Sequence, residues 1–255
     1  MYAEERQQAI AADVSRRGRL SVNEIAEQFE VTTETVRRDL TVLERAGVVR
    51  RVHGGVVAAD SLSMIEAAVA ERDSAHAKEK DAIAVAALEL LPDEHATILV
   101  DAGTTTIRMA ALLPRDRRFT VVTHAVPIAA RVSGLQHIEL RLLPGRVRDT
   151  TQAAVGSDTV ATLAGLRADI AFLGTNGFTA GHGLTTPDAE EAATKSALVR
   201  SAATVVVLTD SSKIGIETTH RFAETREIDV LVTDAGITHD DRAALEKTGL
   251  EVRIA

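Results

Sequence analysis

The apolar residues of this chain recur with a helical period near its start and form short β-branched runs later. Within residues 31–47, Val36, Leu40 and Leu43 are spaced i, i+4 and i+7, which places them on one face of an amphipathic helix. From residue 97 onward, runs rich in Val, Ile and Leu alternate with helical stretches. The pattern therefore predicts a helical N-terminal part followed by an α/β part.

The N-terminal pattern predicts a winged helix-turn-helix. Ser21 and Glu24 have the spacing of a capping box, which opens a helix, and Thr32 or Thr33 can cap the helix that follows. The predicted elements are helices at residues 2–17, 22–29 and 31–47 and strands at residues 48–52 and 56–57. The two strands form the wing, and we expect its residues Arg51, His53 and Gly54 to contact the DNA backbone or the minor groove.

The exposed face of the helix at residues 31–47 carries side chains suited to reading DNA. Thr33 and Thr35 lie in its first turn and are followed by Arg37 and Arg38. The first residues of a recognition helix reach base edges in the major groove, where Arg reads guanine through two hydrogen bonds. Taken alone, the same face also fits a solvated charged surface. One of the two arginines is expected to pair with Asp39 or a phosphate rather than a base.

The formal net charge of −8 argues at first against DNA binding. Residues 1–57, however, contain nine Lys and Arg and nine Asp and Glu, so the remaining 20 basic and 28 acidic residues account for the whole deficit. Phosphate contact requires local positive charge, and residues 32–53 carry five Arg against three acidic residues. We therefore expect a small basic surface whose affinity for DNA falls strongly with added salt.

Composition narrows the remaining classes of protein. Cysteine is absent, which excludes disulfides and thiolate chemistry and makes a reducing cytoplasm the expected compartment. The polar N-terminus does not resemble a signal peptide, and no apolar run approaches the roughly 20 residues of a membrane helix. The histidines lack metal-ligand spacing, and glycine-rich nucleotide motifs are missing, so we expect no metal, no cofactor and no membrane partner.

The second part of the chain predicts a mainly parallel sheet covered by helices. The predicted strands are residues 97–100, 119–123, 138–143, 170–173, 204–208, 230–233 and 251–254. The predicted helices include residues 83–91, 105–113, 158–166, 188–201 and 240–247. Such alternation is typical of parallel sheets, in which a ligand binds beyond the carboxyl ends of the strands.

Small and polar residues follow these strands and should gather at one edge of the sheet. The run from Asp101 to Thr106 places a glycine and three threonines where a helix opens after a strand, and free N–H groups there attract an anion. Lys213 would supply countercharge. An ordinary Asp or Thr N-cap without a ligand is the alternative. The predicted effector-binding residues are Asp101, Gly103, Thr104, Thr105, Thr106, His124, Gly145, Arg146, Gly174, Thr175, Asn176 and Lys213.

Long motifs in both parts resemble DeoR-type (DeoR/GlpR family) bacterial transcription regulators. ETVRRDLTVLERAGVVRRVHGG resembles their DNA-binding domain, and DAGTTT, FLGTNGF, GLTTPDAEEAATK and LTDSSKIG resemble their effector domain. The resemblance implies a winged helix-turn-helix at residues 1–57, a linker at 58–75 and a sugar-phosphate-binding domain at 76–255 with a ribose-5-phosphate isomerase-like fold. His124 and Pro144 depart from the family pattern, which commonly has Asn and Gly there. The predicted DNA-binding residues are Ser21, Thr33, Thr35, Arg37, Arg38, Arg51, His53 and Gly54.

The resemblance implies a repressor of sugar-metabolism genes that binds double-stranded operator DNA as a homodimer or homotetramer and is released by a phosphorylated sugar. The alternative is a sugar-phosphate isomerase, which needs a carboxylate base beside the carbon acid. Related isomerases carry acids after the strand that here ends at Leu173, and a Glu where this chain has Thr194. Glu190 and Glu191 are expected on a solvated helix face or as N-terminal-turn charges. The sequence therefore favours binding without turnover.

Overall fold

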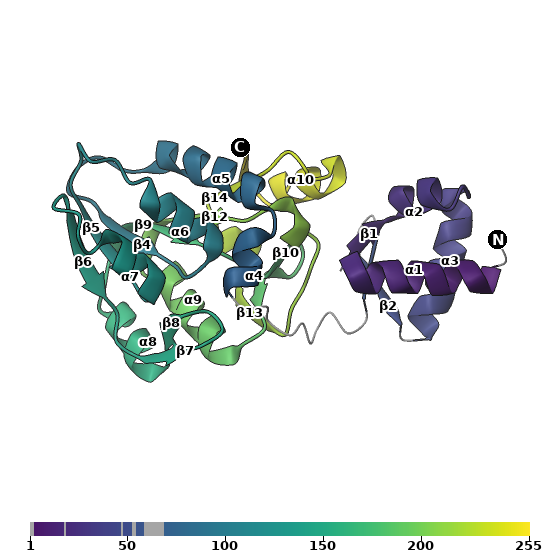
Figure 1. The fold of residues 1–255 in the computed structure, drawn as a ribbon, viewed down its shortest axis with the longest axis horizontal. Coiled ribbons are helices and arrows are strands. Elements are labelled where there is room, and N and C mark those ends of the chain that lie inside the picture. The colour runs from purple at the N-terminus through teal and green to yellow at the C-terminus, as the bar shows by residue number, and fades with distance from the viewer. Residues whose placement is uncertain (1–2, 18, 47, 53–54, 59–68) are drawn as a thin grey trace.

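The computed structural model describes residues 3–17, 19–46, 48–52, 55–58 and 69–255. The N-terminal residues form a small body with an apolar core of its own, and the remainder forms a larger body with two further core clusters (Figure 1). The boundaries of the domains and of the linker stay a prediction. Among the described residues, no helix combines the length and the apolar character that crossing a membrane requires.

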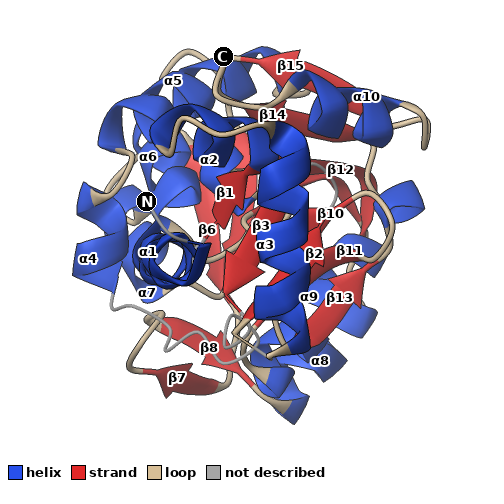
Figure 2. Cartoon of the chain, turned by 90° about the vertical axis from the view of Figure 1, so that its right-hand side faces the viewer, coloured by secondary structure: helices blue, strands red, loops and turns tan. Residues whose placement is uncertain are grey.

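The small body contains three helices and a three-stranded antiparallel sheet. Its elements are α1 (Ala3–Arg17), β1 (Arg19–Ser21), α2 (Val22–Gln28), α3 (Thr33–Arg45), β2 (Val49–Val52) and β3 (Gly55–Ala58), with strand order β1-β3-β2. Figure 2 looks along α1 and shows α2, α3 and the strands around it. The predicted winged helix-turn-helix is confirmed. Strand β1 escaped prediction because three residues are too few to show a period, and it forms only by pairing with β3.

Local capping and one apolar stripe explain the helices of the small body. Ser21 caps α2, and the Glu24 carboxylate accepts from the Ser21 backbone N–H at 2.7 Å, which confirms the capping box. Thr32 is the N-cap of α3. Val36 and Leu40 are fully buried on one side of α3 and pack with residues of α1 and α2. Burial of this stripe fixes which face of α3 remains available to a partner.

The larger body is built on a seven-stranded parallel sheet. Its strands are β4 (Thr97–Val100), β5 (Phe119–Thr123), β6 (Ile138–Leu142), β9 (Ala168–Leu173), β12 (Ala202–Leu208), β14 (Val230–Thr233) and β15 (Glu251–Ile254). All seven predicted strands are confirmed, in the order β15-β14-β12-β9-β4-β5-β6. The chain adds strands outward from β4 in one direction and then from β9 in the other. The strand order therefore reverses between β4 and β9, which is where open α/β sheets bind ligands.

Helices cover both faces of this sheet. One face carries α5 (Ala77–Ala87), α6 (Thr104–Ala111) and α7 (Val126–Val132), and the other carries α8 (Ser157–Ala164), α9 (Ala189–Arg200) and α10 (His239–Glu246). Ile98 and Val100 belong to the first core cluster and Leu99 to the second, because alternate residues of a strand face opposite sides. Burial on both faces explains why the strands are apolar throughout. A short helix, α4 (Val69–Ser74), precedes α5 and contacts α6.

Shorter elements escaped prediction because tertiary contacts, rather than local pattern, define them. They are the hairpin of β7 (Arg146–Arg148) and β8 (Ala153–Val155), the sheet of β10 (Gly177–Thr179), β11 (Gly183–Thr186) and β13 (His220–Ala223), and the turns η2 (Leu88–Leu90), η3 (Ser211–Lys213) and η4 (Thr225–Glu227). Gly183 shows the constraint most clearly. Its φ is +93°, and a Cβ there would lie 2.2 Å from the Ala223 carbonyl oxygen, so only glycine allows β11 to pair with β13.

Candidate functional site

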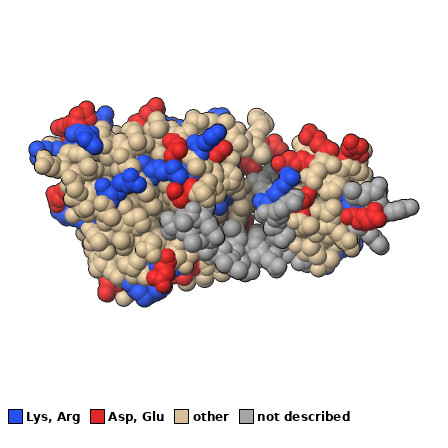
Figure 3. Space-filling model, viewed as in Figure 1, with Lys and Arg blue, Asp and Glu red and all other residues tan. Residues whose placement is uncertain are grey.

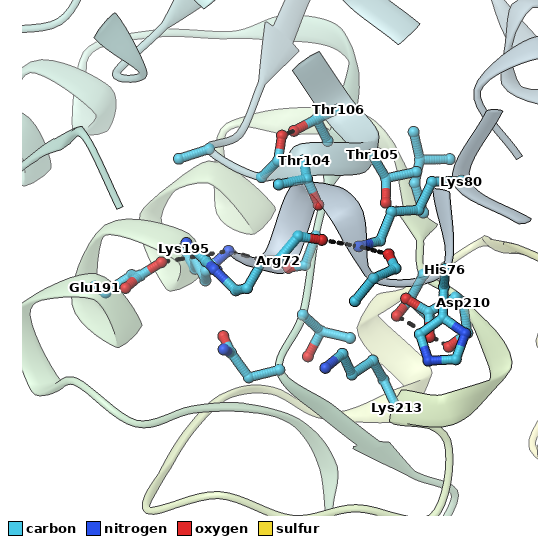
Figure 4. A pocket seen from close by; sticks show the side chains of 18 residues that line it. Arg72, His76, Lys80, Thr104, Thr105, Thr106, Glu191, Lys195, Asp210 and Lys213 are labelled. Carbon is cyan, nitrogen blue, oxygen red and sulfur yellow. Dashed lines mark hydrogen bonds and ion pairs between the residues drawn. The ribbon is translucent and has the colours of Figure 1, made fainter. Parts of the chain in front are cut away.

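A pocket of about 200 Å³ lies at the point where the strand order reverses (Figure 4). It combines backbone and side chains of the loops after β4, β9 and β12 with residues of α4, α5 and α9. The residues that line it are Arg72, Ala75, His76, Lys80, Ala102, Gly103, Thr104, Thr105, Thr106, Gly174, Thr175, Asn176, Glu191, Lys195, Leu208, Thr209, Asp210 and Lys213. Eight of the twelve predicted effector-binding residues, Lys213 among them, therefore line this pocket.

The first turn of α6 presents hydrogen-bond donors to this pocket. Gly103 is the N-cap and provides no side-chain cap, so the first N–H groups of the helix have no partner within the helix itself. The Thr106 hydroxyl donates to the Gly103 carbonyl at 2.9 Å, which fixes the turn. Thr104 and Thr105 line the pocket and are otherwise buried. Free amides, the positive end of the helix dipole and adjacent hydroxyls together suit an anion.

Asp101 lies beneath the pocket and organises it rather than lining it. One carboxylate oxygen lies 2.9 Å from His124 Nε2; the other accepts from the Gly174 backbone N–H at 2.9 Å and from the Lys195 ammonium. Burial by itself would raise the pKa of Asp101, but the charge of Lys195 and the His124 hydrogen bond outweigh it, so this pKa lies below its usual value. The carboxylate is therefore committed to tying the β4 and β9 loops together. The prediction that Asp101 contacts the effector directly does not fit this geometry.

His124 is also an internal residue rather than a pocket residue. Its side chain is fully buried, and Nδ1 lies 2.8 Å from the Ala154 carbonyl oxygen, which can only accept, so Nδ1 carries a proton. Nε2 faces both Asp101 and the Ala102 backbone N–H, at 3.2 Å from the latter. The imidazole thus connects the β4 loop to β8. It acts on the pocket only through Asp101 and Ala102.

Lys213 reaches the pocket from a turn that buried acids hold in place. Asp234 accepts from the Ser211 N–H at 2.6 Å and from the Ser211 hydroxyl at 2.8 Å. Burial would raise the pKa of Asp234, but the hydrogen bonds from Ser211 and from the Gly236 N–H outweigh it and lower this pKa. Within the described part of the chain, the Lys213 ammonium makes no hydrogen bond or ion pair. It is the cation best placed to meet an incoming anion.

The structure adds three cationic residues that were not among the predicted effector-binding residues. Lys195 is 2% exposed, contacts Asp101 and Gly174, and lies 5.4 Å from the centre of the Phe222 ring. Lys80 donates to the backbone carbonyls of Arg72 and, at 2.7 Å, of Ala75; burial lowers its pKa. Arg72 itself lines the pocket. Lys80 lies on the same buried face of α5 as Ile83, Ala84 and Ala87. A lysine at an apolar position of a helix is the sequence signal that could have identified it.

Glu190 and Glu191 differ in environment, which partly corrects the expectation of a solvated face. Glu191 is 2% exposed, lines the pocket, and forms ion pairs with Arg148 and, at 4.0 Å, with Lys195. Glu190 is about half exposed and pairs with Arg146 at the surface. Both lie in the first turn of α9, where the dipole favours acids, as expected. Burial of Glu191 follows from the position of α9 against the pocket, which the sequence did not reveal.

Gly145 and Arg146 were predicted to bind effector, but they are not among the residues that line the pocket. Gly145 has a φ of +141°, and a Cβ there would lie 2.3 Å from the Thr159 hydroxyl and 2.7 Å from the Val155 carbonyl oxygen. Its role is close packing of the loop between β6 and β7. Arg146 pairs with Glu190, and Arg148, which follows two residues later on the same strand face, is the arginine that reaches a pocket residue.

The exposed face of α3 carries the residues predicted to read DNA. Arg37 and Arg38 are exposed, at 57% and 81% of their side-chain surface, and each lies within 4 Å of Glu34. Asp39 pairs with neither of them: it is buried and accepts from Arg6 at 2.6 Å. This hydrogen bond raises the pKa of Arg6. Of the two partners expected for one of these arginines, Asp39 is therefore excluded, because it lies on the buried side of α3 and joins it to α1. Contact with a phosphate stays a prediction.

The other predicted DNA-binding residues lie in two places. Thr33 and Thr35 are in the first turn of α3, where the Thr35 hydroxyl is 3.0 Å from that of Thr32, and Ser21 caps α2. Arg51 is exposed on β2, and its N–H donates to Glu44 at 3.1 Å. His53 and Gly54 lie outside the described residues. On the visible face of the larger body, Lys and Arg lie among Asp and Glu, so positive charge there is not gathered into one patch (Figure 3).

Comparison with known proteins covers both parts of the chain. A family model described as a DeoR-like helix-turn-helix domain matches residues 6–62, and one described as a DeoR C terminal sensor domain matches residues 75–235. The chain is 34% identical to the HTH-type transcriptional regulator GlpR of Haloferax volcanii, over 99% of this chain and 98% of that protein. It is 34% identical to the lactose phosphotransferase system repressor of Staphylococcus epidermidis, over 87% of this chain and 88% of that protein.

Solved structures include a more distant similarity. Ribose 5-phosphate isomerase A from Methanocaldococcus jannaschii aligns with a TM-score of 0.40 and 18% identity, over 53% of each chain.

Proposed function

Because the chain belongs to the DeoR family of transcriptional regulators, we propose that it binds operator DNA through α3 and the wing and that a phosphorylated sugar in the pocket controls this binding. One observation supports an anion as the ligand of the pocket. The first turn of α6 meets the side chains of Lys195 and Lys213 in a single pocket. Asp101 and Glu191, the acids nearest to Lys195, already have basic partners.

The remaining lining residues support a sugar as the rest of the ligand. Thr175, Asn176 and Asp210 place hydroxyl, amide and carboxylate groups around the same space, and these groups hydrogen-bond well to sugar hydroxyls. The repressor from Staphylococcus epidermidis is named for a lactose phosphotransferase system, which agrees with a sugar-linked role. We favour a hexose or pentose phosphate over a nucleotide, because the pocket measures about 200 Å³.

The proposed mechanism is repression that the effector relieves. A homodimer or homotetramer would hold two copies of α3 over half-sites about one helical turn, roughly 34 Å, apart. An effector releases the operator only if it binds more tightly to a state whose two DNA-binding domains no longer match that spacing. Chromosomal DNA as the target makes the cytoplasm the expected compartment.

One observation favours the alternative function, a sugar-phosphate isomerase: Glu191 is buried and lines the pocket. A base for proton abstraction must be able to approach the carbon acid and accept its proton. Glu191 instead forms ion pairs with Arg148 and Lys195, and Thr194 beside that lysine donates its hydroxyl to the Glu190 carbonyl at 2.9 Å. We therefore propose binding without turnover.

The test is effector-dependent release from DNA. Duplexes selected in vitro for binding to the protein are titrated by fluorescence anisotropy, with and without fructose 6-phosphate, glucose 6-phosphate and ribose 5-phosphate. We expect tight binding by the wild type and release by at least one sugar phosphate, with no isomerisation of any of the three. Lys213→Ala should bind DNA unchanged but respond only at much higher sugar-phosphate concentration, and the exposed Lys247→Ala should behave as wild type. Turnover without DNA binding would reverse the proposal.

A further inference from the structure

Strand β6 is the last strand at one side of the large sheet, and within the described part of the chain no further strand pairs with its outer edge. Figure 1 shows it at the outer side of the larger body. We propose that β6 pairs antiparallel with β6 of a second copy of this chain, about a twofold axis at Leu140. The large sheets of the two copies then continue into one another.

The backbone of β6 has hydrogen-bonding groups directed away from β5. The His137 carbonyl accepts from the Phe119 N–H at 3.2 Å, and the Leu143 N–H donates to the Thr123 carbonyl at 2.9 Å. Because successive residues of a strand direct their backbone groups to opposite sides, the odd-numbered residues of β6 bond β5 and the even-numbered ones face outward. The N–H and C=O groups of Leu140 have no backbone partner among the described residues. Such an edge can pair with another strand.

The charges of β6 are complementary to those of the same strand running in the opposite direction. Glu139 and Arg141 lie on one face of the strand, are both more than half exposed, and form an ion pair at 2.9 Å. In an antiparallel pair centred on Leu140, Glu139 of each copy lies directly opposite Arg141 of the other. Opposite charges in this arrangement stabilise a strand pair, and like charges destabilise it. The sequence of β6 therefore favours a second β6 as its partner.

The other face of β6 contributes apolar surface to the same arrangement. Leu142 is 53% exposed, and the twofold axis places it opposite Ile138 of the second copy, which packs against the core. Ile138 lines a groove of about 280 Å³ together with Phe119 and His137. The Nε2 atom of His137 is buried and has no hydrogen-bond partner among the described residues. Leu142 of each copy would thus pack at the groove of the other and lose its contact with water, which favours association.

Strand β15, at the opposite edge of the sheet, provides a comparison. It has the same spacing of charges, because Arg253 donates to Glu251 at 2.6 Å. Its middle residue, Val252, is only 8% exposed, however, whereas Leu140 in the middle of β6 is partly exposed. Pairing at β15 would therefore bury less apolar surface than pairing at β6. The charge pattern is shared and the apolar surface is not, so β15 supplies a matched control.

Exchange of the charges on β6 tests the interface in the full-length protein. Sedimentation velocity at several micromolar concentrations measures the mass, and we expect the wild type to be an oligomer. Arg141→Glu places Glu139 of each copy opposite a second carboxylate and should raise the dissociation constant roughly tenfold or more, which shifts the population toward species of half the mass. The double variant Glu139→Arg with Arg141→Glu restores opposite charges and should restore the mass of the wild type.

Two further variants complete the experiment. Leu140→Pro removes an N–H that faces away from β5 and should also favour the species of half the mass, whereas Arg253→Glu on β15 should sediment as the wild type does. Far-ultraviolet circular dichroism shows whether each variant is folded, and the charge variants decide the question if Leu140→Pro is not. A monomeric wild type, an unchanged mass in Arg141→Glu, no recovery in the double variant, or dissociation of Arg253→Glu would overturn the inference. Each of these outcomes leaves the proposed effector pocket untouched.

Discussion

The substitution Asp101→Asn tests the buried ion pair beneath the pocket. It keeps the size of the side chain but removes the negative charge opposite Lys195, which is 2% exposed. Removing one partner of a buried ion pair leaves the other charge uncompensated and typically costs about 3–5 kcal/mol. Asparagine still has one oxygen that can accept from the Gly174 N–H. We therefore expect a loss near the lower end of that range, about 3 kcal/mol.

Urea unfolding followed by far-ultraviolet circular dichroism measures this loss, since the chain has no Trp and one Tyr. With a slope of about 2–3 kcal/mol per molar urea, a loss of about 3 kcal/mol lowers the midpoint by roughly 1–1.5 M. The small N-terminal body has a separate apolar core, so only the transition of the larger body should move. A matched control is Glu246→Gln, which breaks an exposed pair with Arg242 and should cost less than about 1 kcal/mol.

A double variant separates the ion pair from the general effect of changing a buried residue. In Asp101→Asn combined with Lys195→Met, no buried charge remains unpaired between these two positions, so the loss should be at least about 1 kcal/mol smaller than the sum of the two single losses. The reasoning is refuted if Asp101→Asn shifts the midpoint no more than Glu246→Gln does. It is also refuted if the two single losses simply add.

Three other outcomes follow from the same geometry. Arg38→Ala should weaken operator binding by about 1–3 kcal/mol if this side chain reads a base, measured by anisotropy with Arg117→Ala as the control; equal affinities would remove Arg38 from the interface. Asp39→Ala leaves Arg6 without its buried partner and should cost the N-terminal body about 3 kcal/mol in thermal unfolding, whereas an unmoved transition would contradict the assigned role. Because the folded pKa of Asp101 lies below its unfolded value, its contribution is complete above about pH 4 and is lost as pH falls toward the folded pKa. The urea midpoint should therefore fall less between pH 7 and pH 3 in Asp101→Asn than in the wild type, and equal falls would argue against this assignment.

The strands of the large sheet were predictable because their signal is local. Residues 97–100, 119–123 and 230–233 coincide with β4, β5 and β14, since strands buried on both faces need unbroken apolar runs. The order of the strands was not predictable in the same way. Strand β9 pairs with β4 although two further sheet strands, a hairpin and three helices lie between them in sequence. That pairing creates the position where the pocket forms.

Prediction of the residues that line the pocket agreed with the structure for backbone and small residues. Gly103, Thr104 and Asn176 follow the ends of strands, and parallel strands bring their carboxyl ends to one edge. It failed for long side chains: Arg72, Lys80 and Lys195 look like ordinary charged helix residues until packing shows which way they point. The prediction from sequence also placed His124 and Asp101 in direct contact with the effector, whereas both side chains are buried beneath the pocket.

The sequence by itself determined the winged helix-turn-helix, the seven strands and the helix opening at Gly103, because each depends on residues that are close together along the chain. Tertiary structure alone decided that β4 lies beside β9, that Asp39 joins Arg6, and that α4 places Arg72 in the pocket. The physical reason is the range of the interactions. Periodicity and capping act within a few residues, whereas strand order, burial of charge and the lining of a cavity depend on segments that meet only when the chain has folded.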